Sequence, residues 1–117
     1  MTMKVNPKLL IVIRGAGLGE GDVDLCEKLM RNFLKSLISS GEAPARMIFM
    51  GTGIFLTTED SPVIQELKEL ESAGTRIASC LTCLDYYRRS DKLLIGIAGN
   101  MRDAVEAMLS FEKVIQL

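Results

Sequence analysis

Cys80 and Cys83, in the stretch CLTC, are the residues whose type and spacing most clearly allow chemistry. Thiolates bind metals, exchange with disulfides and accept sulfane sulfur, so the pair is compatible with a metal site, a redox disulfide or a sulfur carrier. Two inert core cysteines are a further interpretation, because free cysteine packs like a small apolar residue. That interpretation suits the remaining cysteine, Cys26, which falls on the apolar face of an expected helix.

The sequence contains no histidine, which removes several kinds of site. No Cys–His or Ser–His nucleophile can form, and a structural zinc site needs about four ligands, more than the cysteines supply. We therefore expect neither a metal nor another cofactor. A reactive Cys80 would depend on the amides of a following helix start, with positive charge from Arg88, Arg89 and Lys92 close behind.

The charge balance and the apolar pattern exclude two classes of partner. With 14 Lys and Arg against 15 Asp and Glu, the chain has no broad basic surface for nucleic acid. The apolar run from Leu9 to Ile13 is too short for a membrane span or the core of a signal peptide. We expect a cytoplasmic protein that binds neither nucleic acid nor membranes, folded as one domain over residues 1–117.

The elements that must position the cysteines alternate between strand and helix. Apolar runs rich in Ile and Val predict strands, and apolar residues at three-to-four spacing predict helices. Strands are expected at 8–13, 47–50, 75–79, 93–98 and 113–117, and helices at about 22–40, from 61 to before Gly74, and at 100–109. This alternation predicts an α/β fold with a mainly parallel sheet of about five strands and helices on both faces.

The loops that follow the first four strands fall at one edge of such a sheet, where parallel α/β folds bind ligands. CLTC is one of these loops, and we expect Cys80 to share a single cleft with the others. The glycines after the first strand match neither a dinucleotide fingerprint nor a P-loop, so their first expected role is a tight turn. The expected binding residues are Gly15, Gly17, Gly51, Thr52, Gly53, Asn100 and Met101, together with Arg88.

Four stretches resemble the DsrE/DsrF-like family, most closely the carboxyl-terminal domain of YedF-type proteins associated with selenium metabolism. They are LIVIRGAGLGEGDVDLCEKLMRNFL, MIFMGTGIFLT, SPVIQELKELESAGTRIASCLTCLDYY and EKVIQL, and together they span nearly the whole chain. The resemblance implies a DsrE-like three-layer α/β/α fold, assembly into oligomers, and a third-strand cysteine that carries sulfur as a persulfide. Cys80 corresponds to that cysteine, and Cys83 belongs to the C-x-x-C form of the YedF-like branch. The small amino-terminal domain usual in YedF-type proteins has no counterpart before Lys8, so a stand-alone domain or a fragment is expected.

The expected function is a sulfurtransferase-type persulfide carrier with Cys80 as acceptor thiol, and with donor and acceptor proteins of a sulfur relay as partners. A link to selenium metabolism is a weaker implication of the resemblance. A thiol–disulfide redox protein using Cys80 and Cys83, and a non-catalytic module that binds a ligand or partner, are the alternatives. Self-association is also expected, because 48% apolar residues with seven methionines exceed what one small core hides; a methionine-rich core is the alternative. The expected contact includes Phe55, Leu56, Tyr86 and Tyr87.

Overall fold

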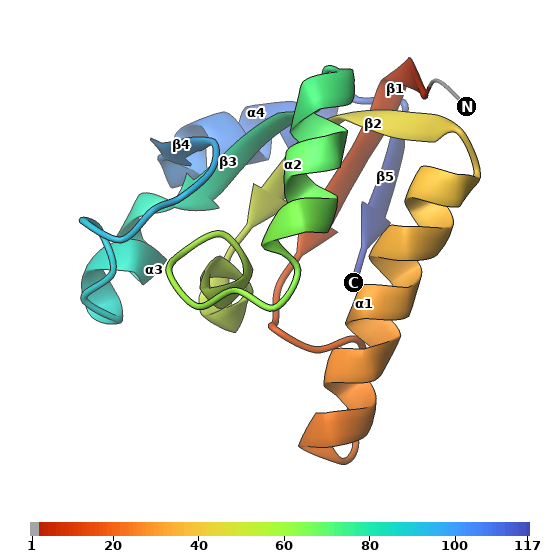
Figure 1. The fold of residues 1–117 in the computed structure, drawn as a ribbon. Helices are drawn as coiled ribbons and strands as arrows, with labels where there is room; N and C mark the ends of the chain where they lie inside the picture. Colours follow the sequence, from red (N-terminus) through yellow and green to blue (C-terminus); the bar gives the residue numbers. More distant parts are fainter. Residues whose placement is uncertain (1–2) are drawn as a thin grey trace.

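A central parallel sheet with helices on both faces forms the computed structural model, which describes residues 3–117 (Figure 1). The strands are β1 (Lys4–Ile13), β2 (Glu42–Phe49), β3 (Arg76–Cys80), β4 (Ile97–Gly99) and β5 (Lys113–Gln116). The helices are α1 (Val23–Ser39), the 3-10 helix η1 (Gly51–Leu56), α2 (Ile64–Ala73), α3 (Leu81–Tyr86) and α4 (Met101–Ser110). All five strands are parallel, in the order β4-β3-β2-β1-β5, which confirms the predicted α/β architecture.

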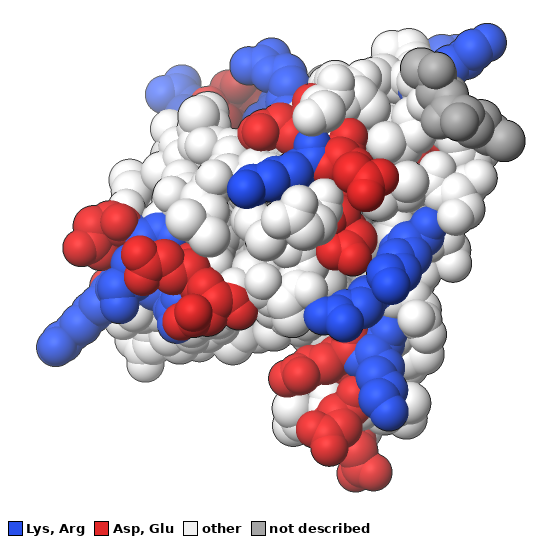
Figure 2. Space-filling view, viewed as in Figure 1, with Lys and Arg blue, Asp and Glu red and all other residues white. Residues whose placement is uncertain are grey.

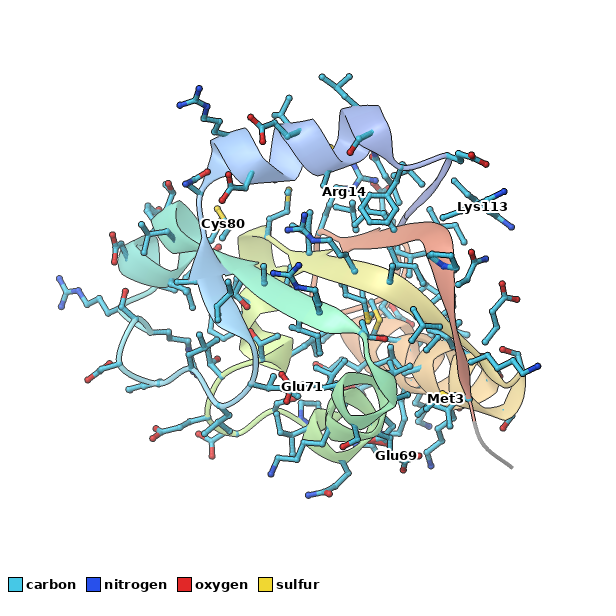
Figure 3. The ribbon with its side chains drawn as sticks, turned by 90° about the horizontal axis from the view of Figure 1, so that it is seen from above. Met3, Arg14, Glu69, Glu71, Cys80 and Lys113 are labelled. Carbon is cyan, nitrogen blue, oxygen red and sulfur yellow. The ribbon has the colours of Figure 1, made fainter. Side chains whose placement is uncertain are left out.

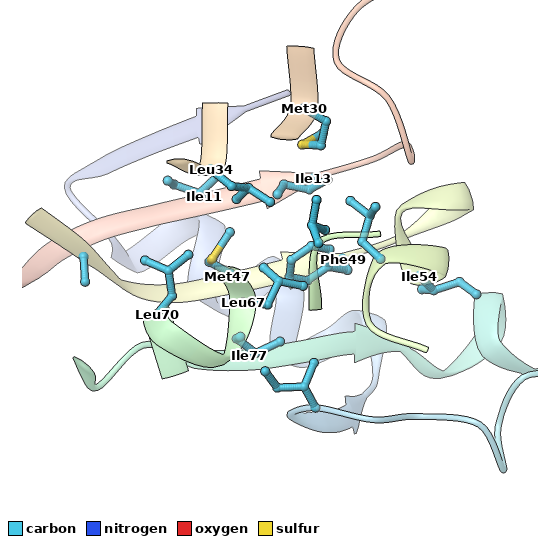
Figure 4. Close-up of a cluster of buried hydrophobic side chains, with 14 of the residues drawn as sticks. Ile11, Ile13, Met30, Leu34, Met47, Phe49, Ile54, Leu67, Leu70 and Ile77 are labelled. Carbon is cyan, nitrogen blue, oxygen red and sulfur yellow. The ribbon is translucent and has the colours of Figure 1, made fainter. Parts of the chain in front are cut away.

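The main core lies on the side of the sheet that α1 and α2 cover. Successive residues of a strand face opposite sides of the sheet, so Ile11 and Ile13 of β1 point to this side. They belong to one buried cluster with Phe49 of β2, Leu34 of α1 and Leu67 of α2 (Figure 4). Full burial of an aliphatic or aromatic side chain of this size contributes about 1.5–3 kcal/mol, so the cluster holds both helices on the sheet.

The opposite side of the sheet is covered by α4 alone. Leu10 and Val12, the alternate residues of β1, pack there with Ile48 and with Ala104 and Ala107 of the helix. Figure 3 shows α4 on one side of the sheet and α1 and α2 on the other. Two alanines let the helix lie close to the strands, but one ten-residue helix leaves part of this side uncovered. This uncovered part is where the candidate site lies.

Three strands differ by three or more residues from their predicted lengths. β1 and β2 start earlier than expected, because Lys4 and Glu42 already pair in parallel. The ladder is irregular between Asn6 and Leu10, where Pro7 has no N–H to contribute. The fourth strand was expected at 93–98 but is only Ile97–Gly99. The residues before it pair elsewhere: Leu93 forms an antiparallel bridge with Thr58, and the Leu94 N–H donates to the Thr57 carbonyl at 2.9 Å.

Charged side chains of both signs are interspersed on the face shown in Figure 2, with no large area of a single sign. Ion pairs between side chains are few: within residues 3–117, only Lys8 pairs with Glu112 and Arg102 with Glu106. No helix in this part of the chain has the length and apolar character that crossing a membrane requires.

Candidate functional site

Cys80 ends β3 and occupies the N-cap position of α3, as the sequence predicted for a strand-end cysteine. Ile77 of the same strand points into the main core, so the alternation of the strand turns Cys80 to the other side, toward α4. Figure 3 shows the Cys80 side chain beside the first turn of α4. Cys80 is buried, with an exposed fraction of 7%.

A buried hydrogen bond fixes the strand end directly before Cys80. The hydroxyls of Ser79 and Thr57 lie 2.6 Å apart, and both residues are buried. The Thr57 hydroxyl also contacts the Ile54 carbonyl of η1 at 3.1 Å. A buried hydroxyl that lost its partner would be costly, about 1–3 kcal/mol, so the pair resists movement of this strand end. The position of Cys80 is therefore fixed from the main-core side of the sheet.

A cavity of about 90 Å³ opens beside Cys80, between the ends of β2, β3 and β4 and the first turn of α4. Most of its lining is small or apolar, with a few polar side chains. The lining residues are Arg46, Ile48, Met50, Ala78, Ser79, Cys80, Ile97, Ala98, Gly99, Asn100, Met101, Asp103 and Ala104. Pockets for drug-sized ligands occupy about 300–1,000 Å³, so this cavity suits a small ion or a short chemical group.

Cys83 lies in the first turn of α3 and is partly exposed. Its sulfur accepts a hydrogen bond from the Gly51 N–H at 3.1 Å. Burial raises the pKa of Cys83; the Gly51 N–H acts in the opposite direction, and a hydrogen bond and charge interaction with Cys80 raise the pKa further. The raised pKa means that Cys83 keeps its proton to higher pH than an ordinary thiol, and part of that rise comes from its interaction with Cys80.

The glycine loops expected at the site lie apart from the Cys80 cavity. Gly15, Gly17 and Thr52 line a separate hollow against α1, together with Cys26. The single shared cleft expected from the sequence is therefore wrong for the 15–21 loop and Thr52, whereas Gly51 contacts Cys83, and Asn100 and Met101 line the Cys80 cavity. These glycine loops lead to elements on the main-core side, whereas Cys80 points to the α4 side.

Close backbone contacts account for several of these glycines. A Cβ on Gly53 would lie 2.6 Å from the Ile13 carbonyl oxygen, and one on Gly51 would lie 2.8 Å from that of Arg14. Gly51 also has φ of 57°, which favours glycine. A Cβ on Gly17 would lie 2.7 Å from the Cβ of Cys26, which is buried as predicted. These glycines have structural reasons to be present.

The positive residues after CLTC do not reach the cavity. Arg88 is exposed, with φ of 56°, and it is not among the cavity residues. Arg89 donates to Thr58 Oγ1 at 3.1 Å and to the Glu59 carbonyl at 3.0 Å, and its guanidinium lies over the Phe55 ring. The charge of Arg89 therefore holds the 55–59 segment in place.

Arg46 is the cavity residue that sequence reasoning missed. It lies on β2 in register with Leu10 and Arg76, and it is half-buried. Residues 46, 48 and 50 share one side of β2, so the alternation of Met47 and Phe49 into the core could have placed Arg46 on the Cys80 side. No motif drew attention to it, because a lone arginine in a strand carries no spacing signal.

The arrangement suits thiol chemistry. Cys80 can act as a nucleophile toward a small group in the cavity, and Cys83 provides a second thiol beside it. Within residues 3–117, no cluster of three or more Cys, Asp or Glu side chains is arranged to hold a metal ion.

Comparison with solved structures reveals the same fold in proteins of low sequence identity. The ychN protein from E. coli matches at 21% identity with a TM-score of 0.68, covering 96% of this chain and 100% of that one. MTH1491 from Methanobacterium thermoautotrophicum, of unknown function, matches at 15% identity with a TM-score of 0.70 and the same coverage. BT1422 from Bacteroides thetaiotaomicron, a conserved protein of unknown function, matches at 18% identity and 0.64, covering 94% of this chain and 95% of that one. No protein-family model and no curated protein matches the sequence. The chain therefore shares its α/β fold, over nearly its whole length, with these three proteins.

Proposed function

We propose that the protein is a sulfurtransferase-type persulfide carrier with Cys80 as the acceptor thiol. The observation that carries this proposal is the position of Cys80, at the end of β3, against a cavity of about 90 Å³. A persulfide adds one sulfur atom to the thiol, and the cavity has room for that atom. The resemblance of the sequence to the DsrE/DsrF-like family supports the same role for Cys80.

Cys83 is proposed to limit the lifetime of the persulfide. A thiolate of Cys83 attacking the inner sulfur would release hydrosulfide and leave a Cys80–Cys83 disulfide. Because the pKa of Cys83 is raised, this attack is slow at neutral pH and accelerates as pH increases. The persulfide would then survive long enough to pass to an acceptor protein of a relay, with a selenium-linked pathway as a narrower version of the same proposal.

A dithiol redox protein is the second candidate, favoured by the contact between the two thiols. In that function the Cys80–Cys83 pair would cycle between dithiol and disulfide with a partner protein. Sulfur loading would then be incidental.

We also propose that the protein self-associates through α4. Large apolar side chains remain exposed along this helix and the neighbouring strand β4. Their exposed fractions are 65% for Ile97, 50% for Met101, 45% for Val105 and 82% for Leu109. Ile97 and Met101 also line the Cys80 cavity, so a second copy on this side would enclose it further. Leu56, expected in a contact, is buried at 2% and is unavailable.

The test is intact mass spectrometry after incubation with a sulfane sulfur donor. A gain of one sulfur atom supports the carrier, the loss of two hydrogens supports the redox protein, and an unchanged mass contradicts both. We expect Cys80→Ser to abolish loading and Cys83→Ser to retain it with a longer persulfide lifetime. Cys26→Ser is the matched control, since Cys26 lies in the separate hollow against α1 and loading should persist. Loading of Cys80→Ser but not of Cys83→Ser would reverse the two roles.

A further inference from the structure

We propose that the Cys80 cavity is a binding site for a small sulfur oxyanion, with Arg46 holding the oxyanion head and Cys80 taking the sulfane sulfur. Thiosulfate is the simplest donor of this class. The inference rests on the proposed carrier function and names the substrate class of the same site.

The side chain of Arg46 is free of protein partners in the part of the chain that the structure describes. Neither an ion pair nor a side-chain hydrogen bond involves it among residues 3–117. A half-buried guanidinium beside a cavity keeps five donors available, in a planar arrangement that matches oxyanions. The arginines that do have partners are Arg14, Arg31, Arg89 and Arg102.

The other charged group at the cavity is Asp103, in the first turn of α4. Its carboxylate is exposed and opposes an anion, while its backbone N–H is occupied by the Asn100 side chain at 2.8 Å. Arg46 also borders a second hollow with Arg76 and Glu71, and Cys80 is not among the residues that line it. The net charge at the cavity therefore depends on Arg46 and Asp103, and the two side chains should have opposite effects on the affinity for an anion.

The size and access of the cavity favour a small donor. Its volume of about 90 Å³ is well below the roughly 300–1,000 Å³ of pockets for drug-sized ligands, which suits a small oxyanion better than a nucleotide. Cys80 is buried, with an exposed fraction of 7%, but it lines the cavity, so a small ion in the cavity lies next to it. A cysteine of a partner protein would have to enter the cavity to reach it.

The transfer step balances without any further reactant. The Cys80 thiolate attacks the outer sulfur of thiosulfate; the bond between Cys80 Sγ and that sulfur forms as the bond to the sulfonate sulfur breaks. The bonding pair leaves with sulfite, and the products are the Cys80 persulfide anion and sulfite dianion. The total charge is the same on both sides. Arg46 would hold the oxygens of the departing sulfite group throughout.

Binding is tested apart from transfer in the Cys80→Ser protein, which binds but cannot react. Thiosulfate is titrated at constant ionic strength while the backbone amide resonances are followed. We expect saturable shifts at Asn100 and Met101, and a Kd raised about tenfold or more by Arg46→Gln, because hydrogen bonds to charged groups are lost. Asp103→Asn should lower the Kd. Arg76→Gln is the matched control, since it removes the same charge from the neighbouring strand position outside this cavity, and it should leave the Kd within twofold.

If Arg46→Gln and Arg76→Gln weakened thiosulfate binding equally, the effect would come from general electrostatic attraction of the anion to positive charge. That result would overturn the inference. Absence of saturable shifts in the titration would overturn it as well. Loading distinguishes this failure from failure of the carrier function. If Cys80 loads from a protein persulfide but thiosulfate does not bind, the carrier function is supported and the oxyanion site is refuted. If thiosulfate binds but no donor loads Cys80, the cavity binds anions but the carrier function is refuted.

Discussion

The two thiols of CLTC differ in their surroundings although they lie three residues apart. Cys80 lines the cavity on the α4 side of the sheet, while Cys83 accepts the Gly51 N–H from the loop after β2. The pKa of Cys83 is raised by burial first and then by its contact with Cys80. The protein thus has one thiol that faces a space for a reactant and one that keeps its proton.

This contact predicts how Cys83 responds to removal of its neighbour. In Cys80→Ala, the hydrogen bond and the charge that raise the pKa of Cys83 are both gone, so its pKa should fall while the effect of burial remains. Below that pKa, alkylation of Cys83 should become faster at any given pH, which peptide mapping after brief exposure to iodoacetamide measures. Cys26→Ala should leave the rate unchanged. A slower Cys83 in Cys80→Ala would contradict this arrangement.

At the scale of elements, the close approach of η1 to β1 explains glycines that the sequence had suggested for binding. A Cβ on Gly53 would lie 2.6 Å from the Ile13 carbonyl oxygen, whereas a Cβ on Gly15 would have only ordinary contacts, at 3.6 Å. Two glycines with similar expectations from the sequence thus have different structural roles. The difference arises from the packing of η1 on β1, which no local pattern reveals.

Gly53→Ala and Gly15→Ala therefore form a matched pair. We expect Gly53→Ala to lower the free energy of unfolding by about 1–3 kcal/mol, since the backbone must move to admit the methyl group. Gly15→Ala should change it by less than about 0.5 kcal/mol. Urea denaturation followed by circular dichroism measures both. Sulfur loading of the folded Gly53→Ala protein should match that of the wild type, and a selective loss of loading would instead indicate a binding role.

For the whole molecule, the strand and helix alternation was sufficient to predict the parallel sheet and the edge where Cys80 lies. It was insufficient to predict which side of the sheet each loop serves. The 15–21 loop and Cys80 share an edge, yet they lie on opposite sides because Ile13 and Cys80 point in opposite directions. The place of Arg46 at the cavity could not be predicted for a related reason. It depends on which side of β2 the residue faces and on the absence of a nearby partner, and both follow from the register of the assembled sheet.

Self-association through α4 is the prediction that belongs to this scale. Replacing Val105 and Leu109 with lysine places two charges in the exposed apolar row, which should shift the protein toward monomer. Sedimentation velocity at several concentrations measures the change. Gln65→Lys, on an exposed position of α2, is the control and should leave the distribution as in the wild type. A wild-type protein that sediments as a monomer at high micromolar concentration would refute the interface.

Because the sheet separates Cys80 from the 15–21 loop, that loop offers an attachment point for engineering. Gly19, Glu20 and Gly21 are exposed, and a Cβ on either glycine would meet no atom within 4 Å. Two contacts with Cys26 anchor the loop: the Leu18 N–H donates to the Cys26 carbonyl at 2.9 Å, and the Cys26 thiol donates to the Gly19 carbonyl at 3.6 Å. An affinity tag or a fluorescent label inserted between Glu20 and Gly21 would project from the main-core side. The protein could then be immobilised or followed in a mixture without a group attached on the Cys80 side of the sheet.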